Sequence, residues 1–294
     1  MTPIKDYNFL KSLENVQLNF RVPQEGDTHW FELSYIAGIF RKLEQWDAFS
    51  SYSFKLIAFR YPFSFSIDPD DIVFYVSNET HIVPQEISER ARLVFTANYP
   101  FGNNVPANIY TIPLNYNGSV PELPTKSIEE RTNDVFFSGK IHRRRVQFYF
   151  GCQKLKFASK FRNPRPKLDI LFTRKFASGY PPEEYAKHLM NASIALAPPG
   201  WFSSITHRFF EAVRFGNVVI SCELPDHWYF KPFPGIVLKN WCELDKCVNQ
   251  LLISPNKMQQ IHQETLMYYQ DYCTEQAVSN YVKSVILKSN DIEA

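Results

Sequence analysis

The chain has 294 residues, of which 45% are hydrophobic and 21% are charged. This balance excludes an intrinsically disordered protein, and the length suffices for one large domain or two of moderate size. The net charge of only +2 excludes a strong bulk attraction to nucleic acid, so we expect no nucleic-acid partner.

The N-terminal segment 1–14 has no apolar stretch of signal-peptide length, and no run in the chain approaches about 18 apolar residues. If this N-terminus is native, we expect a cytoplasmic protein, with peripheral membrane contact left open. If the chain is a trimmed Golgi-type enzyme, we expect the Golgi lumen. The five cysteines form no CxxC pair, so we expect free thiols and no metal site.

The first half of the chain alternates strand and helix patterns, which predicts an α/β unit. Residues 1–20 read as a loose start with a short strand at 17–20. Apolar residues at helical spacing predict a helix between 27 and 49. The remaining expected elements are strands at 54–59, 71–76, 93–96 and 109–114 and a helix at 86–92.

The polar, proline-containing segment 117–133 is the predicted linker. Beyond it the same alternation resumes. We expect strands at 135–138, 168–173, 193–197, 218–221 and 235–239, helices at 146–155, 183–190, 207–215 and 243–252, and a helical tail from 255. The chain thus divides into α/β domains at 1–125 and 126–255 and a tail at 256–294 that we expect to pack back on the first domain.

The segment 191–226 reads as strand, polar loop, helix and strand. Pro198, Pro199 and Gly200 forbid regular structure after the first strand, and the following serines, including Ser204, can begin a helix. Gly216 stands where a helix C-terminus favours positive φ. A strand, a tight loop and a helix N-terminus are the usual anion site of an α/β protein.

Arg208 and Glu211 lie at i, i+3 near the start of this helix. The guanidinium could bind a diphosphate with paired donors, and the carboxylate could accept both hydroxyls of a ribose. The alternative is a surface ion pair worth a few tenths of a kcal/mol.

A second basic feature follows the strand at 135–138, where Gly139 precedes Arg143, Arg144 and Arg145. At least one of these arginines should reach the crevice at the strand ends, although a solvated basic turn is the alternative. Neither GxxxxGK[ST] nor GxGxxG occurs, so the P-loop and dinucleotide-binding signatures are absent.

The patterns NASIALAPPGW, RFFEA and GNVVIS, with the earlier FFSGK and RRR, resemble the exostosin-type (GT47-like) glycosyltransferases of the GT-B fold. The resemblance implies two Rossmann-like domains facing a cleft. It also implies that Arg208 contacts the diphosphate, Glu211 the ribose, and an arginine among 143–145 assists, so Arg144 and Arg145 are candidates. The matching positions are Pro199, Gly200, Ser204, Arg208, Glu211, Ala212 and Gly216, and Asn217 departs from the family's more frequent Cys.

The resemblance further implies an inverting, nucleotide-sugar-dependent transferase for hexosyl or related transfer in polysaccharide biosynthesis. Its substrates would be a nucleotide sugar and a glycan or glycolipid acceptor, with no obligatory metal or other cofactor. A catalytic base is expected in the first domain, and Glu79, Asp27 and His81 are the candidates at strand ends or helix starts. Asp27 could instead be a helix cap and His81 a simple loop residue.

Two other functions fit the same residues. One is a non-catalytic, nucleotide-sugar-binding partner subunit of a glycosyltransferase complex, which keeps the fold and the nucleotide site. The other is a nucleotide-dependent enzyme of a different class. The donor sugar, the acceptor and the oligomeric state have no signature in the sequence.

Overall fold

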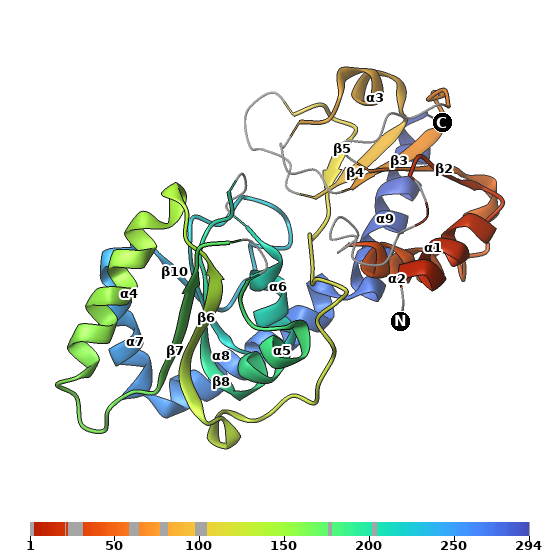
Figure 1. The fold of residues 1–294 in the computed structure, drawn as a ribbon. Coiled ribbons are helices and arrows are strands. Elements are labelled where there is room, and N and C mark those ends of the chain that lie inside the picture. Colours follow the sequence, from red (N-terminus) through yellow and green to blue (C-terminus); the bar gives the residue numbers. More distant parts are fainter. Residues whose placement is uncertain are drawn as a thin grey trace. The chain divides into compact units, whose positions relative to one another are not determined.

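A computed structural model describes residues 3–20, 22, 32–58, 65–76, 82–97, 105–175, 178–201 and 205–293 of the chain. It divides into two compact units (Figure 1). Unit 1 comprises Met1–Gly118, His227–Tyr229 and Asp271–Ala294, and unit 2 comprises Ser119–Asp226 and Phe230–Gln270. The first division falls inside the predicted linker, and the predicted tail is divided between the units after residue 270.

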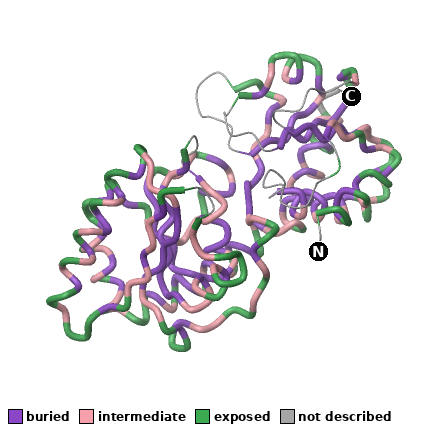
Figure 2. The backbone as a smooth tube through the Cα atoms, viewed as in Figure 1, coloured by how far each residue is buried: buried purple, intermediate pink, exposed green. Residues whose placement is uncertain are grey.

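Unit 1 is built on a five-stranded parallel sheet in the order β1-β2-β3-β4-β5. Its strands are β1 (Val16–Leu18), β2 (Ser53–Ala58), β3 (Asp71–Val76), β4 (Leu93–Thr96) and β5 (Ile109–Thr111). Both β3 and β4 are buried throughout, as expected for parallel strands covered on two faces (Figure 2).

The helices of unit 1 are α1 (Pro3–Ser12), α2 (Leu33–Leu43), α3 (Gln85–Arg90) and α9 (Glu275–Glu293). Alternate residues of the strands, such as Phe54 and Phe74, form one apolar cluster with α1, α2 and α9. The intervening residues, such as Val73 and Tyr75, form a second cluster with Ile87 of α3. The sheet therefore has an apolar core on each face.

Unit 2 is built on a second five-stranded parallel sheet, in the order β10-β9-β8-β6-β7. Its strands are β6 (Asn133–Lys140), β7 (Leu168–Thr173), β8 (Ala192–Ala197), β9 (Val218–Cys222) and β10 (Ile236–Leu238). Since β7 lies on one side of β6 and β8 on the other, the strand order reverses between β6 and β8. Ligands of open α/β sheets bind at the carboxyl ends of the strands at such a reversal.

The helices of unit 2 are α4 (Val146–Ser159), α5 (Pro182–Asn191), α6 (His207–Arg214), α7 (Leu244–Leu252) and α8 (Pro255–Tyr268). One face of the sheet packs against α4, α7 and α8 in a single apolar cluster. The opposite side carries α5 and α6 (Figure 1). A π-helical turn, Tyr269–Cys273, follows α8 and precedes α9.

One expectation about the first 50 residues is wrong. Residues 3–12 form α1 instead of a loose start, because Leu10 and Tyr7 are buried and Asp6 pairs with Arg41 of α2 at 2.7 Å. The helix predicted between 27 and 49 is confirmed as α2, Leu33–Leu43.

The expected fold class is confirmed. The chain contains two α/β units with parallel, Rossmann-like sheets and helices at its C-terminal end. Strands 71–76, 93–96 and 168–173 have the predicted bounds.

Candidate functional site

The candidate site lies in unit 2, where β6 and β8 end. The two strands pair directly, and the chain leaves β8 through Pro198, Pro199 and Gly200 before α6 begins at His207. The loop after β6 leads through a short 3₁₀ turn, Arg143–Arg145, into α4. Both predicted basic features thus reach the same edge of the sheet.

Arg208 extends from the first turn of α6 to the end of β6. Its Nε donates a hydrogen bond of 2.6 Å to the carbonyl oxygen of Ser138. A Cβ atom at Gly139 would lie 3.0 Å from Nη2 of Arg208, so glycine at this position gives the guanidinium its place against the backbone. The two Nη groups make no hydrogen bond with any residue in the described part of the chain and can donate to a ligand.

Arg145 meets the same edge from the start of α4. The side chain is buried, its Nε donates to the carbonyl oxygen of Pro199 at 2.7 Å, and its Nη1 donates to that of Lys140 at 2.9 Å. It therefore ties the loop after β8 to the end of β6. Burial, followed by repulsion from Arg208, lowers the pKa of Arg145 to about 9, so it stays charged at neutral pH.

The pKa of His142 is lowered by its surroundings at this edge. Burial is the largest cause that lowers its pKa to about 4, and the cations Arg145, Arg144, Lys140 and Arg208 lower it further. Its Nδ1 atom is buried and has no hydrogen-bond partner among the described residues. These four cations form no ion pair with any carboxylate of the described residues, so positive charge predominates at this edge and favours an anion.

Trp201 forms an exposed rim beside these cations. Its ring lies 5.1 Å from that of His142, and the guanidinium of Arg143 stands 5.7 Å from the ring centroid. Arg144 donates a long hydrogen bond of 3.4 Å to the Trp201 carbonyl oxygen. Of the two predicted arginines, Arg145 is anchored inside the site and Arg144 is exposed at its rim.

Glu211 lies one turn after Arg208 on α6 and is only 4% exposed. Tyr185, from the first turn of α5, donates its hydroxyl to this carboxylate. Burial raises the pKa of Tyr185 well above its ordinary value, and Glu211 raises it further, while Arg208 and Arg145 oppose the rise. The hydroxyl of Tyr185 therefore remains protonated, and Glu211, Arg208 and Arg145 all lie near enough to this hydroxyl to affect its pKa. Because Glu211 is buried, this carboxylate does not lie on the protein surface.

The C-terminus of α6 is held by a separate set of polar contacts. Gly216 has φ of +66°, as predicted for a helix C-terminus, and its carbonyl oxygen lies 2.6 Å from Nδ1 of His262. Arg131 donates to the carbonyl oxygens of Phe215 and Ala192, both at 2.6 Å. The buried Asn217 donates to the end of α5 at Leu189. These contacts fix the direction of α6 and so the position of Arg208.

The structure brings together Arg208, Glu211, Arg144, Arg145, Pro199 and Gly200 in unit 2. Ser204, Asp27, Glu79 and His81 lie outside the described residues. Tyr185, His142 and Trp201 also lie at this edge and were not predicted from the sequence. Of these, only Trp201 had a signal, since it immediately follows the Pro-Pro-Gly loop.

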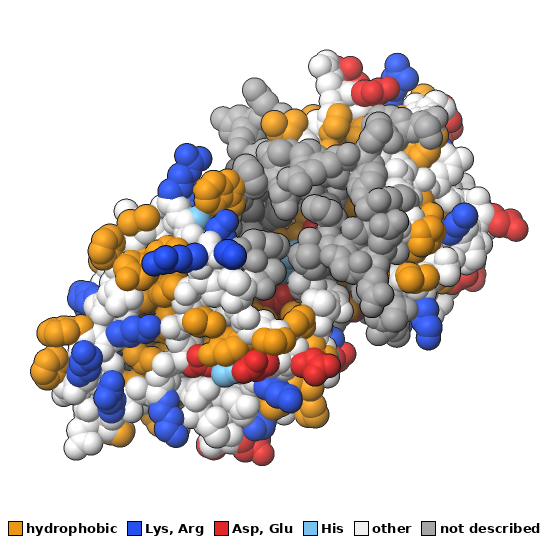
Figure 3. Space-filling view, viewed as in Figure 1, with side chains coloured by type: hydrophobic (Ala, Val, Ile, Leu, Met, Phe, Trp, Pro, Cys, Tyr) orange, Lys and Arg blue, Asp and Glu red, His pale blue; other side chains and the backbone are white. Residues whose placement is uncertain are grey.

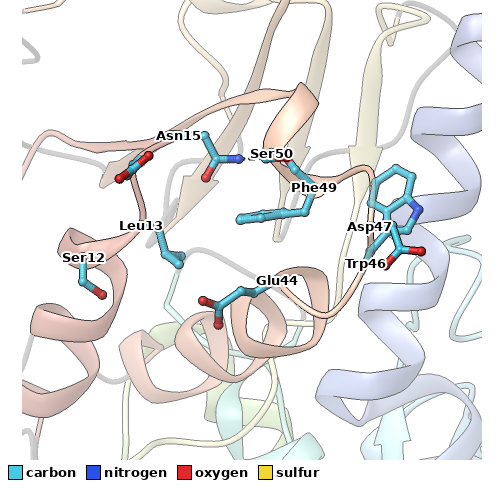
Figure 4. Close-up of a pocket in the computed structure, with 9 residues that line it drawn as sticks. Ser12, Leu13, Asn15, Glu44, Trp46, Asp47, Phe49 and Ser50 are labelled. Atoms are coloured by element: carbon cyan, nitrogen blue, oxygen red, sulfur yellow. Dashed lines mark hydrogen bonds between the residues drawn. The ribbon is translucent and has the colours of Figure 1, made fainter.

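A pocket of about 370 Å³ is present in unit 1 (Figure 4). Its lining includes Leu13, Phe49 and the acidic residues Glu14, Glu44 and Asp47. These residues come from the segments that precede β1 and β2, so the pocket lies at the amino ends of these strands. That is the edge opposite to the one where α/β proteins bind substrates.

The described residues contain no group of three or more His, Cys, Asp or Glu side chains placed to hold a metal ion. No helix formed by these residues is both long and apolar enough to span a bilayer.

The sequence matches neither a known family model nor a curated protein. Solved structures do resemble the fold. HepE from Anabaena in complex with UDP aligns with a TM-score of 0.43 and 11% identity, over 74% of this chain and 72% of that chain. Sucrose-phosphate synthase from Thermosynechococcus elongatus aligns with a TM-score of 0.43 and 9% identity, over 92% of this chain and 81% of that one.

A chain of the complex of accessory secretory proteins 1, 2 and 3 from Streptococcus pneumoniae aligns with a TM-score of 0.50 and 9% identity. The alignment covers 87% of this chain and 57% of that chain. At these identities the likeness concerns the fold alone.

Proposed function

We propose that the protein is a glycosyltransferase that takes a sugar from a nucleotide donor and transfers it to a glycan or glycolipid acceptor. The observation that carries the proposal is the cluster of cations at the β6/β8 reversal, which has no carboxylate ion-pair partner in the described part of the chain. UDP complexes of HepE, one of the structurally similar proteins, agree with a nucleotide as the anion.

Arg208 and Arg145 would bind the diphosphate. In each, Nε donates to a backbone carbonyl, which fixes the plane of the guanidinium before a ligand arrives. Pre-oriented, partly desolvated donors lose little conformational entropy on binding and stabilise negative charge strongly. The same groups would stabilise the diphosphate as it leaves the anomeric carbon.

Glu211 would bind the ribose hydroxyls. Its carboxylate follows the diphosphate-binding arginine by one helical turn, and the Tyr185 hydroxyl holds it in place. Two carboxylate oxygens can accept from both hydroxyls of a ribose at once. The carboxylate also compensates part of the buried positive charge.

The reaction would be a single inverting displacement. The acceptor oxygen forms a bond to the anomeric carbon while the bond to the diphosphate breaks, and a base removes the acceptor proton. Asp27, Glu79 and His81 of unit 1 remain our candidates for this base. Arginines in place of a metal would neutralise the leaving group, so the proposed transfer needs no obligatory cofactor.

Donor hydrolysis and transfer with a panel of nucleotide sugars test this function. We expect turnover with at least one donor, unchanged by EDTA and lost in Arg208→Ala and Glu211→Ala. Arg165→Ala is the matched control, because Arg165 is an exposed arginine of unit 2 before the amino end of β7. Nucleotide binding without turnover of any donor would favour the non-catalytic subunit, and no binding would contradict both.

A further inference from the structure

We propose that the outward face of α4 docks on an anionic membrane surface. Four apolar side chains along this face are exposed to solvent. They are Val146 (45% exposed), Phe150 (63%), Phe157 (64%) and, one residue past the helix cap, Phe161 (77%). The rings of Phe157 and Phe161 contact each other at a centroid distance of 5.3 Å.

These four residues form one stripe. Their spacings of 4, 7 and 4 residues place them within about 60° of arc on a helix that turns 100° per residue. The opposite side of α4 is occupied by the buried residues Phe148, Cys152 and Leu155, which pack on the sheet. The helix is therefore apolar on two faces, and the sheet covers only one of them.

Basic residues predominate in the segment that carries the stripe, and one of them, Arg162, pairs with Asp245 of α7. Residues 140–167 contain ten Lys and Arg and no Asp or Glu. Because the whole chain carries +2, the remaining 266 residues carry a net charge of −8. Lys154 and Lys160, both exposed, border the stripe on its two sides. Figure 3 shows hydrophobic and basic side chains interleaved, without acidic ones, over the left of the molecule where α4 lies in Figure 1.

Exposed phenylalanines between lysines match the chemistry of a lipid interface. The rings can enter the boundary between headgroups and acyl chains, while the lysine stems lie along apolar surface and their ammonium groups reach the phosphates. Each basic side chain near an anionic surface raises partitioning about fivefold. A stripe of three phenylalanines also exceeds the scattered single apolar residues that are normal on a soluble surface.

The positive charge beside the stripe favours an anionic lipid surface over a second copy of this chain or another protein as the partner of this face. A second copy of this chain would bring the exposed Lys154 and Lys160 against like charges, which opposes self-association through this face. A protein partner would need an acidic, apolar groove that fits one helix face, whereas a membrane needs only anionic headgroups above a fluid layer of acyl chains. The proposal is independent of the proposed transferase activity.

Flotation of the full-length protein with vesicles tests the proposal. We expect binding to vesicles of phosphatidylcholine with about one third phosphatidylglycerol and little binding to pure phosphatidylcholine. The variant Phe150→Ser/Phe157→Ser/Phe161→Ser should reduce vesicle binding at least about tenfold, and Lys154→Gln/Lys160→Gln about 20- to 30-fold.

The matched control is Ile82→Ser/Met267→Ser/Leu287→Ser, which removes three exposed apolar side chains from other elements and should bind like wild type. Unchanged melting temperatures verify that the phenylalanine variant remains folded, as expected from its exposed positions. Equal flotation of the phenylalanine variant and wild type would overturn the proposal. So would equal binding to neutral vesicles, or a wild-type dimer that the phenylalanine substitutions convert to a monomer.

Discussion

The two sheets of this protein share strand number and strand direction but differ in strand order. In unit 1 the described strands follow one another as β1 to β5, without a reversal between neighbours. In unit 2 the order reverses between β6 and β8. At this reversal the helices that follow the two strands leave on opposite faces, so their N-terminal ends diverge and leave a crevice.

The two units also differ in the charge of the residues at these edges of their sheets. The edge of unit 2 at the reversal gathers Arg145, Arg208 and Lys140 around a neutral His142. The pocket of unit 1 lies at the opposite, amino edge of its sheet and is lined by Glu14, Glu44 and Asp47. Parallel strands alone thus do not make an anion site; the reversal and the residues that follow the strands do.

The largest expected effect is the loss of nucleotide binding in Arg208→Ala. Removal of the anchored guanidinium should weaken the affinity for UDP by about 100-fold, or about 3 kcal/mol, measured by isothermal titration calorimetry. Arg208→Lys should recover only part of this, because an ammonium group lacks the paired donors. If Arg208→Ala binds UDP as tightly as Arg165→Ala does, the edge of unit 2 at the reversal does not bind the nucleotide through Arg208.

The next effect concerns the glycine beneath that guanidinium. Gly139→Ala places a methyl group 3.0 Å from Nη2 of Arg208, so the guanidinium must shift by a few tenths of an ångström. We expect about tenfold weaker UDP binding with a melting temperature close to that of wild type. A matched alanine substitution at exposed Lys167, at the amino edge of the same sheet, should leave the affinity unchanged.

A smaller effect concerns the pH dependence of stability. The pKa of His142 is about 4 in the folded protein and near 6.5 when unfolded, so the unfolded chain binds an additional proton between these values. Stability should therefore fall as the pH drops from 6.5 to 4. Because His142 is partly exposed, we expect about 1 kcal/mol of this loss between pH 7 and 5 to be absent in His142→Asn.

Urea unfolding at the two pH values measures this difference. A bound diphosphate should reduce the loss in the wild type in part, because it offsets the cations that, after burial, lower the pKa of His142. Equal pH dependence in wild type and His142→Asn would show that burial and the neighbouring cations do not lower the pKa of this ring.

The last prediction is that substitutions in the pocket of unit 1 have no effect on UDP affinity or donor turnover. Glu44→Ala/Asp47→Ala removes two carboxylates from the pocket of unit 1 and should leave UDP affinity and donor turnover unchanged. A tenfold or larger change in UDP affinity or in donor turnover would show that the amino edge of unit 1 takes part in function, which contradicts this prediction.

The strands, and the position of Arg208 at the start of a helix after the loop that follows a strand, could be predicted because their signals are local. Continuous apolar runs define β3 and β7, and the loop and helix of 198–216 place Arg208 and Gly216 at opposite ends of α6. The helix α1 was missed because its stability depends on a distant partner, the Asp6–Arg41 ion pair. Strand order has no local signal at all, so the position of the reversal required the structure.

The same limit applies to the surroundings of Glu211. Its spacing from Arg208 is visible in the sequence, but Tyr185 belongs to a different helix and reaches the carboxylate only through the fold. The burial that neutralises His142 also depends on tertiary packing.

Thermal unfolding of the wild-type protein with a panel of nucleoside diphosphates and nucleotide sugars tests the central claim most directly. A ligand that binds only the folded state at about 100 times its dissociation constant stabilises it by roughly 2.7 kcal/mol. We predict a clear rise in melting temperature with at least one nucleotide, which Arg208→Ala reduces and Arg165→Ala does not. If no nucleotide raises the melting temperature, the edge at the β6/β8 reversal is not a nucleotide-sugar site.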